Sequence, residues 1–212
     1  DRTLAVVDCA LWDLAGRTLG QPVHKLIGSY RDKVLAYGST MCGDELDGGL
    51  ATPEDYGRFA EALVARGYKG IKLHTWMPPV SWSPDVKMDL KACAAVREAV
   101  GPDIALMIDA FHWYSRTDAL TLGRGLEKLG FAWIEEPMDE QSISSYAWLA
   151  GQLDIPVLGP ESAAGQHYNR AEWVKAGACD IEFRISHIIL YPKAEMQETK
   201  GSLPFHHKGR NR

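Results

Sequence analysis

The chain has 212 residues, of which 46% are hydrophobic and 24% charged, and its net charge is −5 at pH 7. This composition is typical of a soluble globular protein, and the negative balance argues against nucleic acid as a partner. The sequence has no run of 18 apolar residues and does not begin with a signal peptide, so we expect a cytoplasmic protein that does not span a membrane. Four widely spaced cysteines favour free thiols in a reducing compartment.

Strand-like and helical segments alternate along most of the chain. A first helical segment, 4–28, carries apolar residues at helical spacing. The strands that we then expect are 34–40, 70–76, 104–110, 131–137, 155–161 and 179–183, and the helices are 52–67, 85–101, 115–130, 142–154 and 169–178. Such alternation predicts parallel βαβ units, and the uniformly apolar strands indicate a sheet that is covered on both faces.

The pattern predicts an α/β fold of the (β/α)8 TIM-barrel type, incomplete here. About six βα units can be counted, whereas a full barrel has eight strands and typically about 250 residues. We expect three regions: a helix that precedes the barrel (1–30), a partial barrel (31–183) and an atypical basic tail (184–212). Because an open barrel would expose strand edges, we expect a homo-oligomer.

Three of the expected strands end in a carboxylate, namely Asp109, Glu135 and Glu161. The intervals are 135 − 109 = 26 and 161 − 135 = 26 residues, so one βα unit fills each interval. Neighbouring strands lie roughly 4.8 Å apart, so the three acids would meet at one rim of the barrel. Three anions that close need a cation, and oxygen ligands suit Mg²⁺. Each acid taken singly could instead be a loop residue or a helix cap, and Glu136 should point away from Glu135, outside the ligand set.

Lys72 and His74 lie two residues apart in the strand "GIKLHTW" and therefore share one face of it. In a barrel that face points inward, where an unpaired lysine charge is costly. Nearby carboxylates or a catalytic role would explain the lysine. The alternative is that both side chains lie at a solvated strand end.

The chain resembles the barrel domain of the enolase superfamily, in the mandelate racemase and muconate lactonizing enzyme branch. The resemblance rests on "ALWDLAGRTLGQPVHKLIG", "GYKGIKLH", "LMIDA", "WIEEP" and "IPVLGPE", which cover roughly residues 3–181 in order. It implies that Asp109, Glu135 and Glu161 bind Mg²⁺, and that Lys72 and His74 occupy the family's Lys-x-Lys position. It also implies that residues 1–30 are the trailing helix of an N-terminal capping domain that is otherwise missing.

The resemblance further implies abstraction of a proton α to a carboxylate. Mg²⁺ would stabilise the resulting ene-diolate, while a base on a neighbouring strand would take the proton. Loss of a β-hydroxyl would make the protein a lyase, specifically a dehydratase, and return of the proton to the other face would make it an isomerase, a racemase or epimerase. The expected small-molecule carboxylate substrate is a sugar acid or a hydroxy amino acid.

The sequence departs from the family pattern at several positions. His74 replaces the usual second lysine, and Phe111 stands where the family often has asparagine. The following His112 could be the general acid that helps a hydroxyl leave, or a loop histidine packed beside its aromatic neighbours. The segment "EFRISH" lacks the acid that the family places at the end of its sixth strand. An alternative to the enzyme is therefore an inactive, truncated barrel that at most binds a divalent metal.

Overall fold

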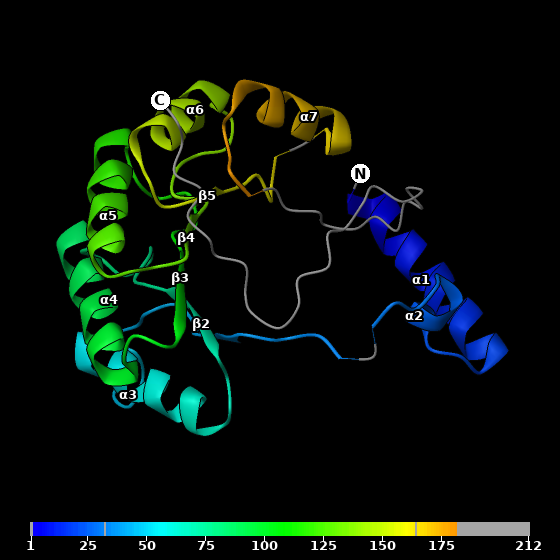
Figure 1. Ribbon diagram of the computed structural model, residues 1–212, viewed down its shortest axis with the longest axis horizontal. Helices are drawn as coiled ribbons and strands as arrows, with labels where there is room; N and C mark the ends of the chain where they lie inside the picture. The colour runs from blue at the N-terminus through cyan, green and yellow to red at the C-terminus, as the bar shows by residue number, and fades with distance from the viewer. Residues whose placement is uncertain (1, 32, 164, 182–212) are drawn as a thin grey trace.

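The computed structural model describes residues 2–31, 33–163 and 165–181 (Figure 1). The expected tail, 184–212, lies outside these residues. The helices are α1 (Arg2–Leu19), α2 (Val23–Leu26), α3 (Pro53–Ala65), α4 (Val86–Val100), α5 (Arg116–Lys128), α6 (Ile143–Gln152) and α7 (Gln166–Ala176). The strands are β1 (Gly38–Ser39), β2 (Gly70–His74), β3 (Ala105–Asp109), β4 (Trp133–Glu135) and β5 (Val157–Leu158). None of the helices in the described residues is long and apolar enough to cross a membrane.

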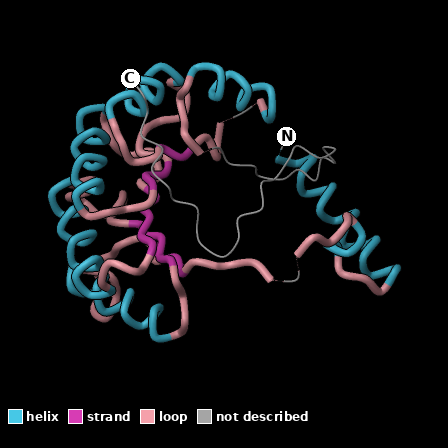
Figure 2. The backbone as a smooth tube through the Cα atoms, viewed as in Figure 1, coloured by secondary structure: helices cyan, strands magenta, loops and turns pink. Residues whose placement is uncertain are grey.

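The five strands form one parallel sheet in the order β1-β2-β3-β4-β5. Figure 2 shows the strands as an inner arc with helices on its outer side, which is the arrangement of successive βα units. The predicted α/β class and parallel sheet are confirmed. The first strand is shorter than the expected 34–40, and the expected sixth strand is represented within the described residues by a bridge from Ile181 to Leu158.

Local sequence signals set the helix ends. Thr52 caps α3 through a capping box with Asp55, whose backbone N–H lies 3.3 Å from Thr52 Oγ1 while Thr52 N–H donates to Asp55 Oδ2 at 2.8 Å. Asp85 and Ser115 accept from backbone N–H groups at the starts of α4 and α5. Helix α4 ends at Gly101, where a φ of 74° suits a residue without Cβ.

The hydrophobic core fills the space between the sheet and the outer helices. Strand residues Ile71, Leu73, Leu106, Ile108 and Ile134 are fully buried. Helix residues that pack in the same cluster are Tyr56, Leu63, Val96, Leu122, Leu126, Tyr146, Leu149 and Trp173. Because the outward-facing strand side chains are held by this packing, their neighbours at alternating positions are directed to the inner side of the arc.

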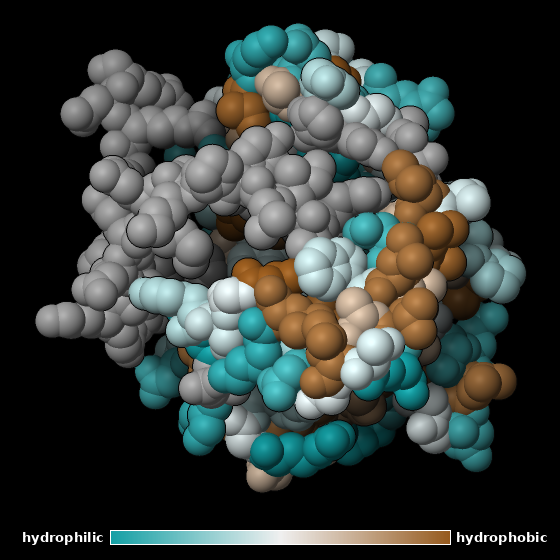
Figure 3. Space-filling view, turned by 90° about the vertical axis from the view of Figure 1, so that its right-hand side faces the viewer, coloured by the Kyte–Doolittle hydropathy of each residue, from teal (hydrophilic) through white to brown (hydrophobic). Residues whose placement is uncertain are grey.

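The N-terminal helix differs from the expectation in two ways. It ends at Leu19 rather than near residue 28, because Gly20 takes a φ of 60° and Pro22 precedes the short helix α2. Its apolar stripe is also exposed: Leu4, Val7, Leu11 and Leu14 are 62%, 51%, 59% and 60% accessible. Figure 3 looks at the side of the molecule where α1 and α2 lie, and shows hydrophobic residues at that surface. The periodicity predicts the helix, but the described residues do not bury its apolar face.

Candidate active site

The candidate site lies where β2, β3 and β4 end. The register pairs His74 with Asp109, and Asp109 with Glu135, so the three residues stand side by side on adjacent strands. Lys72 lies two positions before His74 and reaches the same group. We call Lys72, His74, Asp109 and Glu135 the Lys72 site. The sequence predicted that these four residues would converge, and the structure places them in direct contact.

The Lys72 ammonium group is held between two carboxylates. Lys72 Nζ donates to Asp109 Oδ2 at 3.0 Å and to Glu135 Oε1 at 2.8 Å. The side chains of Lys72, Asp109 and Glu135 are 10%, 5% and 1% exposed, so the lysine is buried among the carboxylates rather than solvated at the strand end. Burial would lower the pKa of Lys72, but hydrogen bonding to Glu135 and the charge of Asp109 outweigh burial and raise that pKa above its ordinary value.

His74 is held from both ring nitrogens. Nε2 lies 3.1 Å from Asp109 Oδ2, and Nδ1 lies 3.0 Å from the carbonyl oxygen of Thr40 in the segment after β1. Both of these partners are acceptors, so a doubly protonated ring satisfies both contacts and a neutral ring satisfies one. The backbone of His74 is fixed as well, since its N–H donates to Thr40 Oγ1 and its carbonyl accepts from Tyr56.

The two carboxyl groups of the Lys72 site respond differently to their surroundings. Burial opposes ionisation of Asp109, but its bonds to His74 and Lys72 lower the pKa below the ordinary value. Burial and the charge of Asp109 raise the pKa of Glu135, although Lys72 opposes that shift. One lysine thus compensates two close carboxylates incompletely, which is the electrostatic setting in which a divalent cation is favoured.

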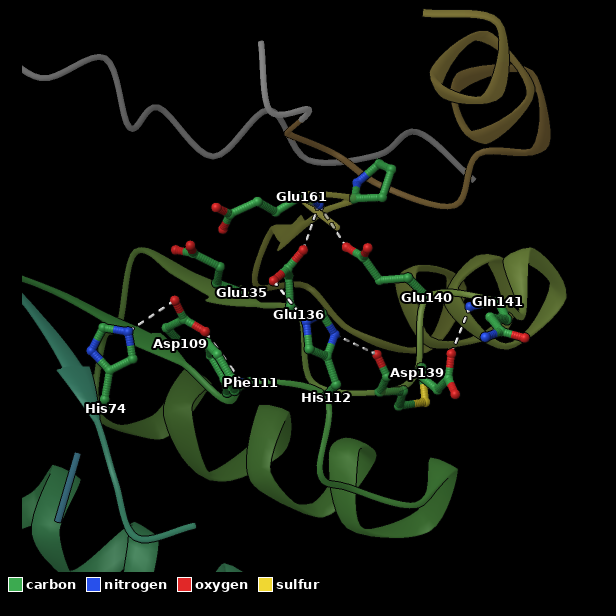
Figure 4. A network of polar contacts seen from close by, with 12 residues as sticks. His74, Asp109, Phe111, His112, Glu135, Glu136, Asp139, Glu140, Gln141 and Glu161 are labelled. Atoms are coloured by element: carbon green, nitrogen blue, oxygen red, sulfur yellow. Dashed lines mark hydrogen bonds and ion pairs between the residues drawn. The ribbon is translucent and has the colours of Figure 1, made fainter. Parts of the chain in front are cut away.

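Glu161 lies farther along its strand than the equal spacing suggested. Glu135 pairs with Leu158, so Glu161 stands three residues beyond that register, past Gly159 and Pro160. Glu161 is an exposed residue, and its carboxylate extends on the same side as Glu135 and Asp109 (Figure 4). Burial, followed by the charges of Glu136 and Asp109, raises the pKa of Glu161. Ligand atoms of Asp109, Glu135 and Glu161 do not all come within 4.8 Å of one another in the described structure.

A second group forms beside the Lys72 site, and His112 belongs to it. His112, Glu136 and Glu140 offer ligand atoms that all lie within 4.8 Å of one another, and we call them the His112 cluster. His112 Nε2 lies 3.2 Å from Glu136 Oε2, and Nδ1 lies 3.3 Å from the carbonyl oxygen of Met138 (Figure 4). Its hydrogen bond to Glu136 outweighs burial and raises the pKa of His112 to about 9.

Glu136 and Glu140 were not predicted as site residues. Glu136 points away from the Lys72 site, as the alternation of side chains along a strand suggests. It is nevertheless buried, at 2% exposure, and it forms an ion pair with His112. Glu140 is 7% exposed. A signal was present in the sequence, because two acids four residues apart follow the end of β4 and a histidine follows the end of β3, the neighbouring strand.

These features define a parallel α/β barrel protein with its polar centre at the carboxyl ends of adjacent strands. Residues 55–186 match the enolase C-terminal domain-like family, and residues 2–28 match the mandelate racemase / muconate lactonizing enzyme N-terminal domain. The chain therefore belongs to the mandelate racemase / muconate lactonizing enzyme family of the enolase superfamily.

Several relatives in this family are named as enzymes of sugar acids or of their lactones. D-galactarolactone cycloisomerase of Agrobacterium fabrum is 36% identical over 84% of this chain and 44% of its own length. L-talarate/galactarate dehydratase of Salmonella typhimurium is 35% identical over 76% of this chain and 37% of its own. The crystal structure of D-glucarate dehydratase from Agrobacterium tumefaciens complexed with magnesium is 88% identical, with a TM-score of 0.84, over 86% of this chain and 47% of that one. The chain thus spans less than half the length of these relatives.

Proposed function

We propose that the Lys72 site is the proton-transfer centre of an Mg²⁺-dependent enzyme that acts on small carboxylate substrates. The observation that carries this proposal is the placement of Lys72 between Asp109 and Glu135, with His74 beside them, at the ends of three adjacent parallel strands. A lysine and a histidine that both touch the carboxylate of Asp109 can move a proton next to a bound cation.

The residues present fit a hard divalent cation. Asp109 and Glu135 supply carboxylate oxygens that already surround a positive charge, the ammonium group of Lys72. Burial and the charge of Asp109 raise the pKa of Glu135 although Lys72 opposes that shift, which supports a further cation beside these carboxylates. We propose Glu161 as the third ligand, because its carboxylate extends on the same side of the strand ends (Figure 4). Mg²⁺ would supply electrostatic stabilisation of the negative charge that develops on the substrate carboxylate.

Lys72 and His74 are the proposed bases. Lys72 must lose a proton before it can accept one, and the carboxylates that raise its pKa are the proposed metal ligands. With those carboxylates engaged by a cation, burial would be the main influence on Lys72 and would lower its pKa toward the range of a base. His74 is fixed by Thr40 and Asp109, so its ring orientation is set before substrate arrives.

His112 is the proposed general acid for a dehydration. With a pKa of about 9, its ring carries a proton at neutral pH that could be given to a leaving hydroxyl group. We infer a sugar acid as substrate, because relatives bear the names arabinonate dehydratase and D-gluconate dehydratase. A racemase or epimerase reaction uses the same first step, and relatives include an N-succinyl-L-Arg/Lys racemase and an L-Ala-D/L-Glu epimerase.

The second candidate is a chain that binds a divalent cation without turnover. The observation that favours it is the sheet itself, which in the described residues is an open arc of five strands rather than a closed barrel. Water that reaches the strand ends would weaken the electrostatic stabilisation that proton abstraction requires.

Exchange of the substrate α-proton with D₂O separates the two candidates. The chain is incubated with a set of sugar acids and Mg²⁺, and loss of the α-proton signal is followed by NMR. Exchange that disappears in Lys72→Ala and His74→Ala supports the enzyme. Mg²⁺ binding without exchange of any acid supports the second candidate, and equal exchange in both single variants would exclude Lys72 and His74 as the bases.

We also propose that copies of the chain associate with one another. Strand β1 forms one edge of the described sheet, and Val34 and Leu35 just before it are 78% and 76% exposed. An unpaired edge with apolar neighbours favours pairing with another chain. We further propose a reducing cytoplasm as the location of the chain, with which the free thiols of Cys9, Cys42 and Cys93 are compatible. Light scattering coupled to size-exclusion chromatography measures the association directly, and a monomer at all concentrations would contradict it.

A further inference from the structure

The His112 cluster has a composition and a burial that the proposed proton-transfer chemistry does not explain. His112 comes from the loop after β3, and Glu136 and Glu140 come from the loop after β4. Glu136 and Glu140 are 2% and 7% exposed, and the side chain of His112 is 25% exposed. Figure 4 shows the three side chains converging on the far side of the β4 end from Asp109 and Glu135.

The cluster brings two buried carboxyl groups close together. Two carboxyl groups face one imidazole ring, and an incompletely paired buried charge is costly. Oε1 of Glu140 accepts from the backbone N–H of Glu161 at 2.6 Å, whereas the buried Oε2 has no hydrogen-bond partner among the described residues. Burial, followed by the hydrogen bond to Glu136, raises the pKa of Glu140 to about 8. The cluster therefore has one cationic ring for two carboxyl groups, and one oxygen of Glu140 lacks a partner among the described residues.

We propose that His112, Glu136 and Glu140 form a second divalent-cation site, which takes a transition metal ion such as Mn²⁺ or Zn²⁺. One imidazole nitrogen and two carboxylates suit these ions better than the all-oxygen set of the first site does. A cation there would replace the protons that His112 Nε2 and Glu140 hold, and it would give Glu140 Oε2 a partner. Ligand atoms within 4.8 Å of one another can reach one ion after small side-chain adjustments.

The orientation of His112 supports this assignment independently. Its Nδ1 lies 3.3 Å from the carbonyl oxygen of Met138, an acceptor, so a ring that binds a cation through Nε2 can keep its proton on Nδ1. That tautomer leaves the lone pair of Nε2 directed at Glu136. Histidines that bind metals commonly have the other ring nitrogen fixed in this way by a carbonyl or a carboxylate.

The backbone also holds the cluster in place before any ion binds. Phe111, His112 and Glu136 have φ values of 52°, 70° and 42°, which non-glycine residues rarely adopt. The two loops are joined by backbone bonds from His112 N to Glu136 O at 2.7 Å and from Tyr114 N to Pro137 O at 3.0 Å. A site built on such a fixed backbone gives its ligands little freedom to move apart.

Occupancy of this site would affect the proposed reaction. An ion on Nε2 takes the place of the proton that His112 needs as a general acid, so the transition metal would inhibit dehydration while leaving Mg²⁺ at the first site. This consequence rests on the proposed function. The second site itself does not, because its ligands are separate from Lys72, His74, Asp109 and Glu135.

Stoichiometric titration with Mn²⁺ tests the site. Free Mn²⁺ is followed by electron paramagnetic resonance in the wild-type chain and in single variants. We expect two Mn²⁺ ions per wild-type chain, and at least a tenfold loss of affinity for one of them in Glu140→Gln and in His112→Asn. Asp139→Asn is the matched control, because it removes one charge from an exposed residue of the same loop. It should bind as the wild type does.

The variant Asp109→Asn separates this proposal from the proposed function. It should weaken the other Mn²⁺ ion and leave the His112 ion in place, and an unchanged first ion would count against the proposed function alone. Unaltered Mn²⁺ binding in both Glu140→Gln and His112→Asn would overturn the second site. If a variant fails to fold by circular dichroism, anomalous scattering from a Mn²⁺-soaked wild-type crystal decides. A peak between His112 and Glu140 supports the site, and no peak there overturns it.

Discussion

Replacing Lys72 with methionine tests whether its ammonium group stabilises the fold. Lys72→Met keeps a long apolar side chain and removes the positive charge, so Asp109 and Glu135 lose a shared donor. Both carboxylates remain buried, with side chains that are 5% and 1% exposed. Asp109 keeps His74, and Glu135 keeps Trp133 Nε1 at 3.1 Å. The variant should fold but be less stable.

The size of the effect follows from the burial of the partners. Removing one member of a buried ion pair typically costs about 3–5 kcal/mol, because the other charge is left uncompensated. For a domain of this size, 1 kcal/mol shifts the melting temperature by about 2–4 °C, so the expected shift is about 6–20 °C. The free energy of unfolding at neutral pH should fall correspondingly.

The effect of pH on the stability difference tests whether Lys72 stabilises ionised carboxylates. The folded-state pKa of Asp109 is depressed from 3.8 to about 2, so its contribution is present above 3.8 and is lost as the pH falls through the folded value. Protonation of Glu135 relieves the same penalty at higher pH, because its pKa is raised. The difference between the wild type and Lys72→Met should therefore shrink as the solution is acidified.

Chemical denaturation of both proteins without metal, followed by circular dichroism, measures this difference. Lys69→Met is the matched control, because Lys69 is an exposed lysine three residues earlier in the chain. Addition of Mg²⁺ should restore more stability to Lys72→Met than to the wild type, since a second cation can replace the lost one. Equal stability of Lys72→Met and Lys69→Met at neutral pH would refute the reasoning.

Three further predictions concern the surroundings of the site. The contribution of His112 to stability should be complete below pH 6.5 and lost as the pH rises through about 9, because Glu136 raises the pKa of His112. Denaturation across that pH range should show a loss of about 1–3 kcal/mol, and His112→Gln should abolish this pH dependence. Tyr114→Phe should cost about 1–3 kcal/mol at neutral pH, because the fully buried Asp89 loses the hydroxyl that donates to it; an unchanged melting curve would contradict this. Thr52→Ala should lower the melting temperature through a loss of about 0.5–2 kcal/mol at the start of α3, and Thr52→Ser should not.

Much of the Lys72 site could be predicted because strand periodicity and βα spacing are both regular there. Lys72 and His74 are two residues apart, so they share a face, and Asp109 and Glu135 are aligned by the register of β3 and β4. The 26-residue interval between Asp109 and Glu135 equals their register offset. The two acids align because the register of β3 and β4 matches their separation in sequence; an equal interval elsewhere in the chain does not guarantee the same alignment.

Glu161 shows where the same reasoning stops. Its interval from Glu135 is also 26 residues, but the register offset between β4 and β5 is 158 − 135 = 23 residues. Strand β5 ends at Leu158, and Gly159 and Pro160 carry the chain onward, so equal spacing no longer means an equal position. The exposed stripe of α1 is a similar case. Helical periodicity predicts which residues share a face, but it does not predict what covers that face.

The end of β4 shows why a buried strand finishes in two carboxylates and a proline. Side chains alternate along a strand, and Glu136 also turns to a φ of 42°, so Glu135 faces Lys72 while Glu136 faces His112. Each carboxylate is buried and contacts a cationic partner, which is Lys72 for Glu135 and His112 for Glu136. Pro137 has no N–H to donate to a further ladder bond, and its carbonyl accepts from Tyr114 in the loop that carries His112. Glu135 therefore belongs to the Lys72 site and Glu136 to the His112 cluster, although the two residues are adjacent in sequence. A mutation of Glu135 should disturb the Lys72 site more than the His112 cluster, and a mutation of Glu136 should do the reverse.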